Sequence, residues 1–405
     1  MVYVVSFSVF TSVIMTLVLF LLLLEARVVP RGKARVVIND DPDKAVESPL
    51  GTTLLSALSA AGIYLPSACG GSGSCGQCRC RVEEGGGDIQ PTELSHLSRQ
   101  EKKDQIRLAC QLKVRQDMRL RLPDYVLSIK KYAATVVSNR NVATFIKELV
   151  AELDKGETLD FKAGQYMQID IPEYELCFDR FDVADRYLAA WEKFNFLDLC
   201  AGTDEPVFRA YSLANPPYEE QLRFTVRIAT PPTGQPDIPP GVGSSYVFNL
   251  KPGDRITLSG PYGDFLVDED SDREICFVGG GAGMAPMRSQ ILHQLNGLGT
   301  GRRITFWYGA RSRQEMFYDE EFRDLAERFY NFSYHVALSE AEPEDNWTGL
   351  TGFIHECLYE EYLKDHDDPA EIEYYLCGPP PMIAALEKML DNLGVDADMI
   401  AYDEF

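Results

Sequence analysis

Residues 274–286 read Glu-Ile-Cys-Phe-Val-Gly-Gly-Gly-Ala-Gly-Met-Ala-Pro, a short apolar strand followed at once by a glycine-rich turn. The next residues, Met287 to Gln294, have the composition of a helix. A strand, a glycine turn and a helix N-terminus in this order leave backbone N–H groups free to bind a pyrophosphate. The turn supplies four candidate cofactor-binding glycines, Gly279, Gly280, Gly281 and Gly283. Met284 stands where the Rossmann fingerprint has its third glycine, so this is not the usual dinucleotide motif.

Further strands follow the same pattern toward the end of the chain. Ile304 to Tyr308 leads into Gly309-Ala-Arg311, and Glu373 to Leu376 leads into Cys377-Gly378-Pro379-Pro380. Alternating strands and helices predict a doubly wound α/β domain over residues 272–405, with a parallel sheet and a ligand at the carboxyl ends of its strands. Arg311 and Arg313 are candidates to bind an adenosine ribose or a 2′-phosphate.

The region before this domain, residues 130–270, changes to short strands separated by glycine and proline. Such strands predict a small antiparallel β-barrel. The predicted strands are Tyr132 to Val137, Thr144 to Leu149, Gln165 to Ile171, Arg209 to Leu213, Leu222 to Ile228 and Arg255 to Ser259.

Three short motifs in the barrel region suit a flavin nucleotide. Arg209, Tyr211 and Ser212 place a cation, an aromatic ring and a hydroxyl on one strand, for a pyrophosphate and a flat ring. Arg227 opens the run Arg-Ile-Ala-Thr, and Ser244 with Ser245 lies in a small-residue stretch that opens a predicted helix with free N–H groups. An ordinary barrel with a surface arginine is the alternative.

Residues 173–208 interrupt the barrel with eight aromatic residues among mostly acidic neighbours. This insertion is too hydrophobic for a solvated loop. Phe178, Tyr187, Trp191 and Phe194 are expected either to pack onto the barrel as a local core or to dock a partner subunit.

A cysteine-rich loop lies nearer the N-terminus, after a predicted strand, Ala34 to Ile38, and a predicted helix, Thr52 to Ala61. Its cysteines follow the spacing C-x5-C-x2-C, and a fourth follows after 31 intervening residues; the candidate metal ligands are Cys69, Cys75, Cys78 and Cys110. Four thiolates are what a 2Fe-2S cluster needs. Structural zinc and unligated thiols are the alternatives, and zinc is disfavoured because Cys110 lacks a nearby cysteine. Cys80 is expected to be a small buried residue.

Composition limits the function classes further. The chain has 405 residues, 45% hydrophobic and 25% charged, so most of it should fold in water as several domains. Its net charge of −23 gives no support for nucleic-acid binding.

The N-terminal segment is the exception to this soluble composition. Val2 to Leu24 contains no charged residue, and 23 residues would span ~34 Å as a helix, enough for a ~30 Å hydrocarbon core. No basic n-region or cleavage site marks it as a removable signal, so we predict a retained transmembrane anchor over residues 1–26, with a buried core helix as the alternative. Basic residues directly after it predict that the following domains face the cytoplasm and that their cysteines stay reduced. These residues are Arg27, Arg31, Lys33 and Arg35.

The order of these segments carries a resemblance to known families. Residues 32–128 resemble a β-grasp ferredoxin domain, and the barrel and the glycine-turn domain resemble the FAD and NAD domains of the ferredoxin-NADP reductase superfamily. With the anchor and the insertion, the whole chain resembles the NADH-oxidising component of bacterial sodium-translocating NADH:quinone oxidoreductases. Three stretches carry this narrower resemblance: Arg209-Ala-Tyr-Ser-Leu, Gly279-Gly-Gly-Ala-Gly-Met-Ala-Pro-Met-Arg and Asp345-Asn-Trp-Thr-Gly.

The resemblance implies FAD, NADH and a 2Fe-2S cluster as cofactors, and partner membrane subunits at the bacterial inner membrane. A flavin is needed because nicotinamide gives up a hydride whereas the cluster accepts single electrons. The resemblance also implies that Cys377 lies beside the nicotinamide and that Phe405 stacks on the flavin; a small strand-end residue and a frayed terminus are the alternatives. A soluble oxygenase reductase and a zinc-binding membrane scaffold remain the rival functions.

Overall fold

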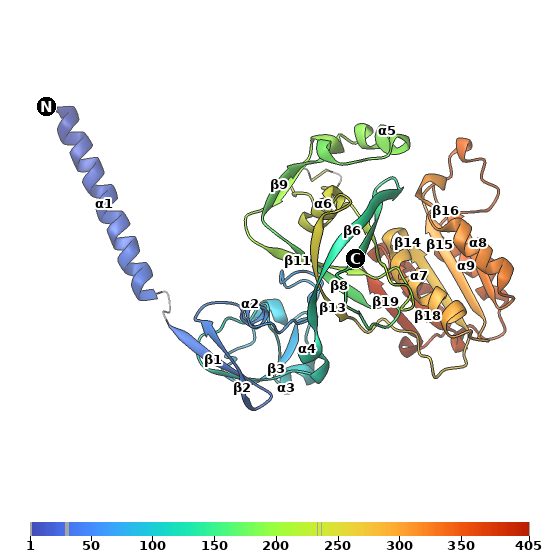
Figure 1. The fold of residues 1–405 in the computed structure, drawn as a ribbon, viewed down its shortest axis with the longest axis horizontal. Helices are drawn as coiled ribbons and strands as arrows, with labels where there is room; N and C mark the ends of the chain where they lie inside the picture. Colours follow the sequence, from blue (N-terminus) through green and yellow to red (C-terminus); the bar gives the residue numbers. More distant parts are fainter. Residues whose placement is uncertain (1, 29–31, 233, 236, 405) are drawn as a thin grey trace. The chain divides into compact units, whose positions relative to one another are not determined.

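The computed structural model describes residues 2–28, 32–232, 234–235 and 237–404, without the side chains of residues 2–5, 8, 21–28 and 404. The chain divides into two compact units at Lys130 and Lys131. The predicted ferredoxin region falls in the first unit, and the predicted FAD and NAD regions fold together in the second (Figure 1).

Helix α1 (Val2–Val28) forms at the N-terminus, where the sequence predicts a membrane anchor. The described side chains of this helix between Phe7 and Phe20 are exposed. Among the residues that the structure describes, no helix combines the length and the hydropathy that a membrane crossing requires. Arg31, one of the basic residues used for the orientation, lies outside the described residues.

The rest of the first unit is a five-stranded sheet with short helices. The strand order is β2-β1-β5-β3-β4, and the central pair β1 and β5 is parallel. Alternation in β1 buries Ala34, Val36 and Ile38, which accounts for the predicted strand. The elements are β1 (Lys33–Ile38), β2 (Asp41–Pro49), α2 (Leu54–Ala60), β3 (Arg79–Glu84), α3 (Arg99–Lys103), β4 (Ile106–Leu108), β5 (Met118–Arg121) and α4 (Asp124–Ser128).

The second unit begins with a six-stranded sheet in the order β11-β8-β13-β6-β7-β12. An antiparallel bridge from Leu213 to Phe224 joins the two outer strands and closes the sheet into the predicted barrel. Its elements are β6 (Lys130–Ala143), β7 (Ile146–Leu153), β8 (Tyr166–Ile171), β11 (Val207–Ser212), β12 (Leu222–Arg227), α6 (Val242–Asn249) and β13 (Arg255–Tyr262).

The insertion forms a local core on the barrel, the first of the two expected alternatives. Its elements are β9 (Tyr174–Cys177), α5 (Asp185–Lys193) and β10 (Cys200–Thr203). Trp191 is fully buried, and its indole N–H donates to the Thr144 carbonyl at 2.8 Å. Its ring also contacts Phe248 of the barrel helix α6 at 5.9 Å between ring centres. Phe194, in contrast, is 51% exposed.

A disulfide between Cys177 and Cys200 corrects the expectation that the cysteines stay reduced. The two residues are direct partners in the antiparallel pair of β9 and β10. That expectation rests on the compartment alone and takes no account of strand register, which brings these two side chains together at the base of the insertion.

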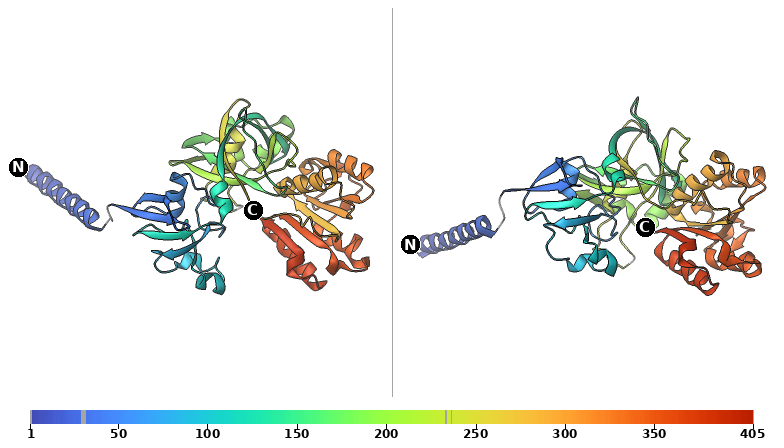
Figure 2. Two further views of the ribbon diagram at one scale, coloured as in Figure 1. Left: turned by 60° about the horizontal axis from the view of Figure 1, so that its bottom comes forward. Right: turned by 90° about the horizontal axis from the view of Figure 1, so that it is seen from below.

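The second sheet of this unit has the order β17-β16-β15-β14-β18-β19 and is parallel, as predicted. Successive residues of its central strand point to opposite faces: Phe277 joins a core with α7 and α8, whereas Val278 joins another with α9 and α10. Helices therefore cover both faces of the sheet (Figure 2). Its elements are β14 (Ile275–Gly280), α7 (Met284–Leu292), β15 (Ile304–Ala310), α8 (Asp319–Arg328), β16 (Phe332–Leu338), β17 (Leu350–Thr351), α9 (Ile354–Glu361), β18 (Glu373–Gly378), α10 (Pro380–Asn392) and β19 (Ile400–Glu404).

Candidate functional site

The four predicted cluster cysteines come together in the first unit as two close pairs. The Cys69 and Cys75 sulfurs are 3.3 Å apart. A hydrogen bond from Cys75 holds the pKa of Cys69 far below its usual value and raises that of Cys75, and the same effect between Cys78 and Cys110 lowers the pKa of Cys110 to about 7. Thiols this close share protons, which a bound metal would displace.

The pairing fits a two-iron cluster better than a single zinc ion. Within the described part of the chain, no three cysteine, histidine or acidic side chains surround one point closely enough to hold an ion. Tetrahedral zinc needs four ligands about one point, whereas a 2Fe-2S cluster takes two thiolates on each iron. Cys80 is buried in β3, as expected for a packing residue.

The loop that carries three of these cysteines depends on glycine. Gly70, Gly71, Gly73 and Gly76 all have positive φ angles between 65° and 92°. Side chains rarely adopt this conformation, so these four positions allow the chain to wrap around the site.

The predicted flavin motifs on β11 and α6 also come together. A Cβ atom added at Gly243, in the first turn of α6, would lie 2.5 Å from Cγ of Arg209 and 2.6 Å from the Tyr211 hydroxyl. The Arg209 guanidinium donates to the Phe208 carbonyl and makes no ion pair with any described residue. A half-buried cation without a carboxylate partner, next to a helix N-terminus, fits a diphosphate.

The other predicted residues of this motif have different surroundings. Ser212 ends β11, which pairs with β8 at Tyr166. The Ser244 hydroxyl accepts the Ala229 N–H at 3.0 Å and donates to the Gly241 carbonyl at 3.1 Å, so it holds the entry to α6.

The glycine turn lies at the carboxyl ends of β14 and β18. A Cβ at Gly283 would fall 2.1 Å from the Cys377 carbonyl oxygen, and one at Gly280 would fall 2.8 Å from the Met382 sulfur. Gly281 has φ +58°. The turn can therefore approach β18 and Met382 only because positions 280 and 283 are glycines.

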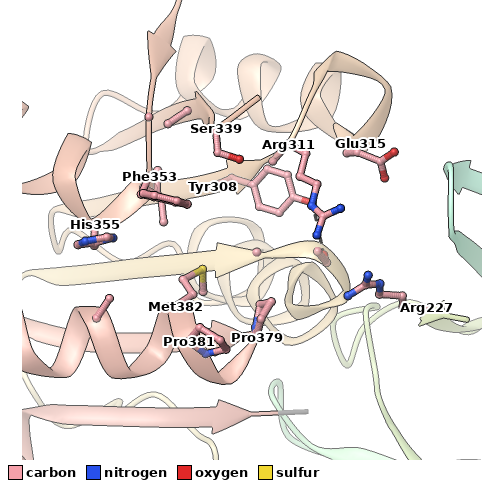
Figure 3. Close-up of a pocket in the computed structure, with 18 of the residues that line it drawn as sticks. Arg227, Tyr308, Arg311, Glu315, Ser339, Phe353, His355, Pro379, Pro381 and Met382 are labelled. Atoms are coloured by element: carbon pink, nitrogen blue, oxygen red, sulfur yellow. Dashed lines mark hydrogen bonds between the residues drawn. The ribbon is translucent and has the colours of Figure 1, made fainter. Parts of the chain in front are cut away.

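A pocket of about 530 Å³ opens beside this turn. Both halves of the second unit line it: Gly281 belongs to the lining, and Arg227, from the end of β12, points toward Arg311 (Figure 3). Burial and the nearby positive charge of Arg311 lower the pKa of Arg227. The two arginines therefore repel each other in the pocket, and a bound diphosphate would balance their charge. The sequence groups Arg227 with the flavin motifs, whereas in the structure its side chain lines the pocket beside the glycine turn.

Other residues of the pocket, which no sequence motif indicates, follow the ends of β15 and β17. Glu315 lies near the two arginines. Burial raises the pKa of its carboxyl group, although hydrogen bonds from Thr144 act in the opposite direction. Phe353 is 62% exposed, and its ring stacks with that of His355 at 6.0 Å between centres. In the sequence, only their position after predicted strands could indicate these residues, because ligands of parallel sheets bind at the carboxyl ends of strands.

The remaining predicted residues take separate places. Pro379 lines the pocket, next to Gly378 at the end of β18. Arg313 does not line it, and its guanidinium donates to the Asp345 carbonyl. Cys377 is fully buried in the core on the α7 side of the sheet. Phe405 lies outside the described residues, directly after β19.

Hydrogen bonds fix the barrel against the glycine turn. The Thr225 hydroxyl of β12 donates to the Ala282 carbonyl at 3.2 Å, and the Ser289 hydroxyl of α7 donates to the Asn215 carbonyl at 2.7 Å. Arg288, also on α7, donates to the Ala214 carbonyl at 2.8 Å. The segment after Ser212 is thus tied to the helix that opens at the turn.

Comparisons with known proteins agree with this division. Three family models match: a 2Fe-2S iron-sulfur cluster binding domain over residues 37–115, an oxidoreductase FAD-binding domain over 192–266 and an oxidoreductase NAD-binding domain over 277–388. The chain is 51% identical to the F subunit of the Na(+)-translocating NADH-quinone reductase of Idiomarina loihiensis over 397 residues, which is 98% of this chain and 97% of the relative. It is also 51% identical to the F subunit of the same reductase from Serratia proteamaculans over 399 residues, 98% of each chain.

Solved structures support the fold. A cytochrome P450 reductase from Amycolatopsis is similar with a TM-score of 0.64 at 24% identity, over 92% of this chain and 98% of that one. The ferredoxin reductase of a carbazole 1,9a-dioxygenase is similar with a TM-score of 0.60 at 25% identity and the same coverage.

Proposed function

The chain belongs to the family of the F subunits of Na(+)-translocating NADH-quinone reductases, and we propose that it oxidises NADH and delivers electrons singly to the other subunits of that complex. The observation that carries the proposal is the nucleotide pocket, which is lined by residues of both the barrel and the parallel sheet. A nicotinamide bound there would lie on the side of the pocket that the barrel lines, where β11 would hold the flavin.

FAD supplies a centre that accepts a hydride and releases electrons one at a time, and the 2Fe-2S cluster supplies a one-electron carrier. The chain's own residues bind and orient these groups. Arg209 binds the flavin diphosphate together with the N–H groups of α6, and Tyr211 and Ser212 contact the flavin ring. Ser244 and Ser245 shape the first turn of α6.

The nicotinamide nucleotide binds through its diphosphate to the N–H groups of the turn from Gly279 to Gly283. Arg227 and Arg311 neutralise its charge, and the Thr225 bond to Ala282 keeps the turn at a constant distance from the flavin strand. Cys377, at the end of β18, and Phe405 would flank the site of hydride transfer, and a nicotinamide bound there would require Phe405 to leave the flavin face.

Cys69, Cys75, Cys78 and Cys110 ligate the cluster. Two close pairs of thiols and the positive φ angles of the loop support this assignment.

The N-terminal helix anchors the protein in the bacterial inner membrane, with the folded domains on the cytoplasmic side. Support comes from the 23 uncharged residues of Val2 to Leu24, which lie within α1, and from the basic residues that follow them. The anchor keeps the protein beside its partners, and a soluble oxygenase reductase has no need of one.

Anaerobic addition of NADH to the purified full chain tests the proposal. We expect the flavin absorbance to bleach and the paramagnetic signal of a reduced 2Fe-2S cluster to appear within one turnover. An unbleached flavin at saturating NADH would contradict the proposed activity.

A flotation experiment tests the anchor separately. The full chain should float with lipid vesicles, whereas a chain lacking residues 1–31 should stay in the soluble fraction. Equal flotation of both chains would exclude the anchor and leave the NADH activity untouched.

A further inference from the structure

The side chain of Gln111, next to the cluster cysteine Cys110, makes two directed contacts. Its amide Nε2 donates to the Cys110 sulfur at 3.4 Å. Its amide oxygen accepts a hydrogen bond from the Thr92 hydroxyl at 2.9 Å. Because Thr92 holds the oxygen, the N–H group is aimed at the sulfur.

The cysteine loop is shaped to accept this amide. A Cβ atom at Gly73 would lie 2.5 Å from Nε2 and 2.9 Å from Cδ of Gln111, closer than real Cβ contacts allow. Gly73 also has φ +86°, which side chains rarely adopt. Only glycine at this position leaves room for the amide against the loop.

An N–H group on a ligand sulfur affects the two oxidation states of a cluster unequally. One-electron reduction adds one negative charge to the cluster and makes or breaks no bond, and the electron comes from NADH through the flavin. A donor on the sulfur stabilises the more negative, reduced state more strongly. Hydrogen bonds to sulfur are one of the protein's means of setting cluster potentials.

We propose that Gln111 raises the reduction potential of the 2Fe-2S cluster through its hydrogen bond to the Cys110 sulfur, with Thr92 and Gly73 holding it in place. This inference rests on the proposed ligation of the cluster by Cys110. Gln111 acts through the ligand and is a positioning residue, not a catalytic one.

The test is a potentiometric titration of the full, cofactor-loaded chain, followed by the paramagnetic signal of the reduced cluster. Gln111→Leu keeps the size of the side chain and removes the donor. At any fixed potential we expect its ratio of reduced to oxidised cluster to fall at least threefold, which is ~30 mV for a one-electron couple at 59 mV per tenfold.

Two further variants separate tuning from general damage. Thr92→Val retains Gln111 but frees its amide, so we expect a smaller shift of the reduction potential in the same direction. This variant keeps the inference testable if Gln111→Leu fails to load its cluster. Gln100→Leu removes an exposed amide that bonds Asp104 and should leave the potential unchanged.

The outcomes distinguish the inference from its premise. A wild-type chain without a 2Fe-2S signal would refute the ligation itself. A normal signal with wild-type potentials in both Gln111→Leu and Thr92→Val would overturn the role of Gln111, as would a shift of equal size in Gln100→Leu.

Discussion

Glu93 forms a buried ion pair that holds the strand leading to Cys110. Its side chain is fully buried and accepts hydrogen bonds from Arg107, at 2.7 Å from Nη2, and from the Leu108 N–H at 2.9 Å. Arg107 is also buried and donates to three backbone carbonyls. Glu93→Gln retains the shape but removes the charge, so it leaves a buried guanidinium with only neutral partners.

Breaking a buried pair of this kind costs ~3 to 5 kcal/mol, because the remaining charge stays desolvated. The three carbonyls and the new amide offset part of this loss, so we expect ~3 kcal/mol. With a urea m-value of ~1 to 3 kcal/mol per molar, the unfolding midpoint of the first unit should fall by ~1 to 3 M.

Urea titration of the loaded chain measures the effect, with cluster absorbance reporting the first unit and flavin fluorescence the second. Only the cluster transition should move. Glu47→Gln is the matched control, because its ion pair with Lys33 is over two-thirds exposed on both sides and should contribute below ~1 kcal/mol.

The pH dependence gives an independent check. Burial alone would raise the pKa of Glu93, but the hydrogen bonds from Arg107, Gln90 and Leu108 hold it below the ordinary 4.5. A carboxylate with a lowered folded-state pKa stabilises the fold above its unfolded pKa, and this contribution disappears as pH falls through the folded value. The difference between wild type and Glu93→Gln should therefore be full at pH 7 and shrink below about pH 4.5. A midpoint for Glu93→Gln within ~0.3 M of wild type at pH 7 would refute the reasoning.

Three further changes should separate the other sites. Cys75→Ser should abolish the cluster signal in paramagnetic resonance yet leave FAD bound and reducible by NADH; an intact signal would contradict the ligand assignment. Arg227→Ala should weaken NADH binding ~10- to 100-fold through loss of a charge-assisted bond worth ~1.5 to 3 kcal/mol, measured by titration, whereas Arg313→Ala, whose side chain bonds Asp345, should change it less. Dithiothreitol should lower the thermal midpoint of the second unit, since a disulfide closing a loop of this size contributes ~3 kcal/mol. The double variant Cys177→Ser/Cys200→Ser should already have the lower midpoint, and a reductant effect of equal size in it would exclude the disulfide as the cause.

Much of the fold could be predicted because local patterns carry it. The glycine turn after β14 indicates the parallel sheet, and the aromatic content of the insertion indicates either a local core, which the structure shows, or a docking surface. The predicted strand at the start of the barrel is too short, because it ends at Val137 whereas β6 continues to Ala143. The later residues of β6 are polar and resemble a turn, but Asn139 is buried and donates to the Val247 and Leu250 carbonyls. These partners lie more than 100 residues away, where no local pattern can reveal them.

The candidate sites show the same limit. The cysteine spacing predicts the cluster ligands, since three of the four proposed ligands lie on one loop and give a local signal. The placement of Arg227 at the nucleotide pocket and the contact of Thr92 with Gln111 both depend on how distant segments pack. The sequence therefore reveals the residues that the chemistry requires, but it does not reveal those that only tertiary contacts bring to a site.

The contiguous first unit has a consequence for how the protein is made. All four proposed cluster cysteines precede Lys130, where that unit ends, whereas the nucleotide pocket is incomplete until Ala385 has been added, 255 residues later as the difference between positions 385 and 130. At synthesis rates of ~5 to 20 residues per second, this interval lasts ~12 to 50 s. The nascent ferredoxin unit can therefore fold and receive its iron and sulfide while the ribosome is still synthesising the half that will reduce it.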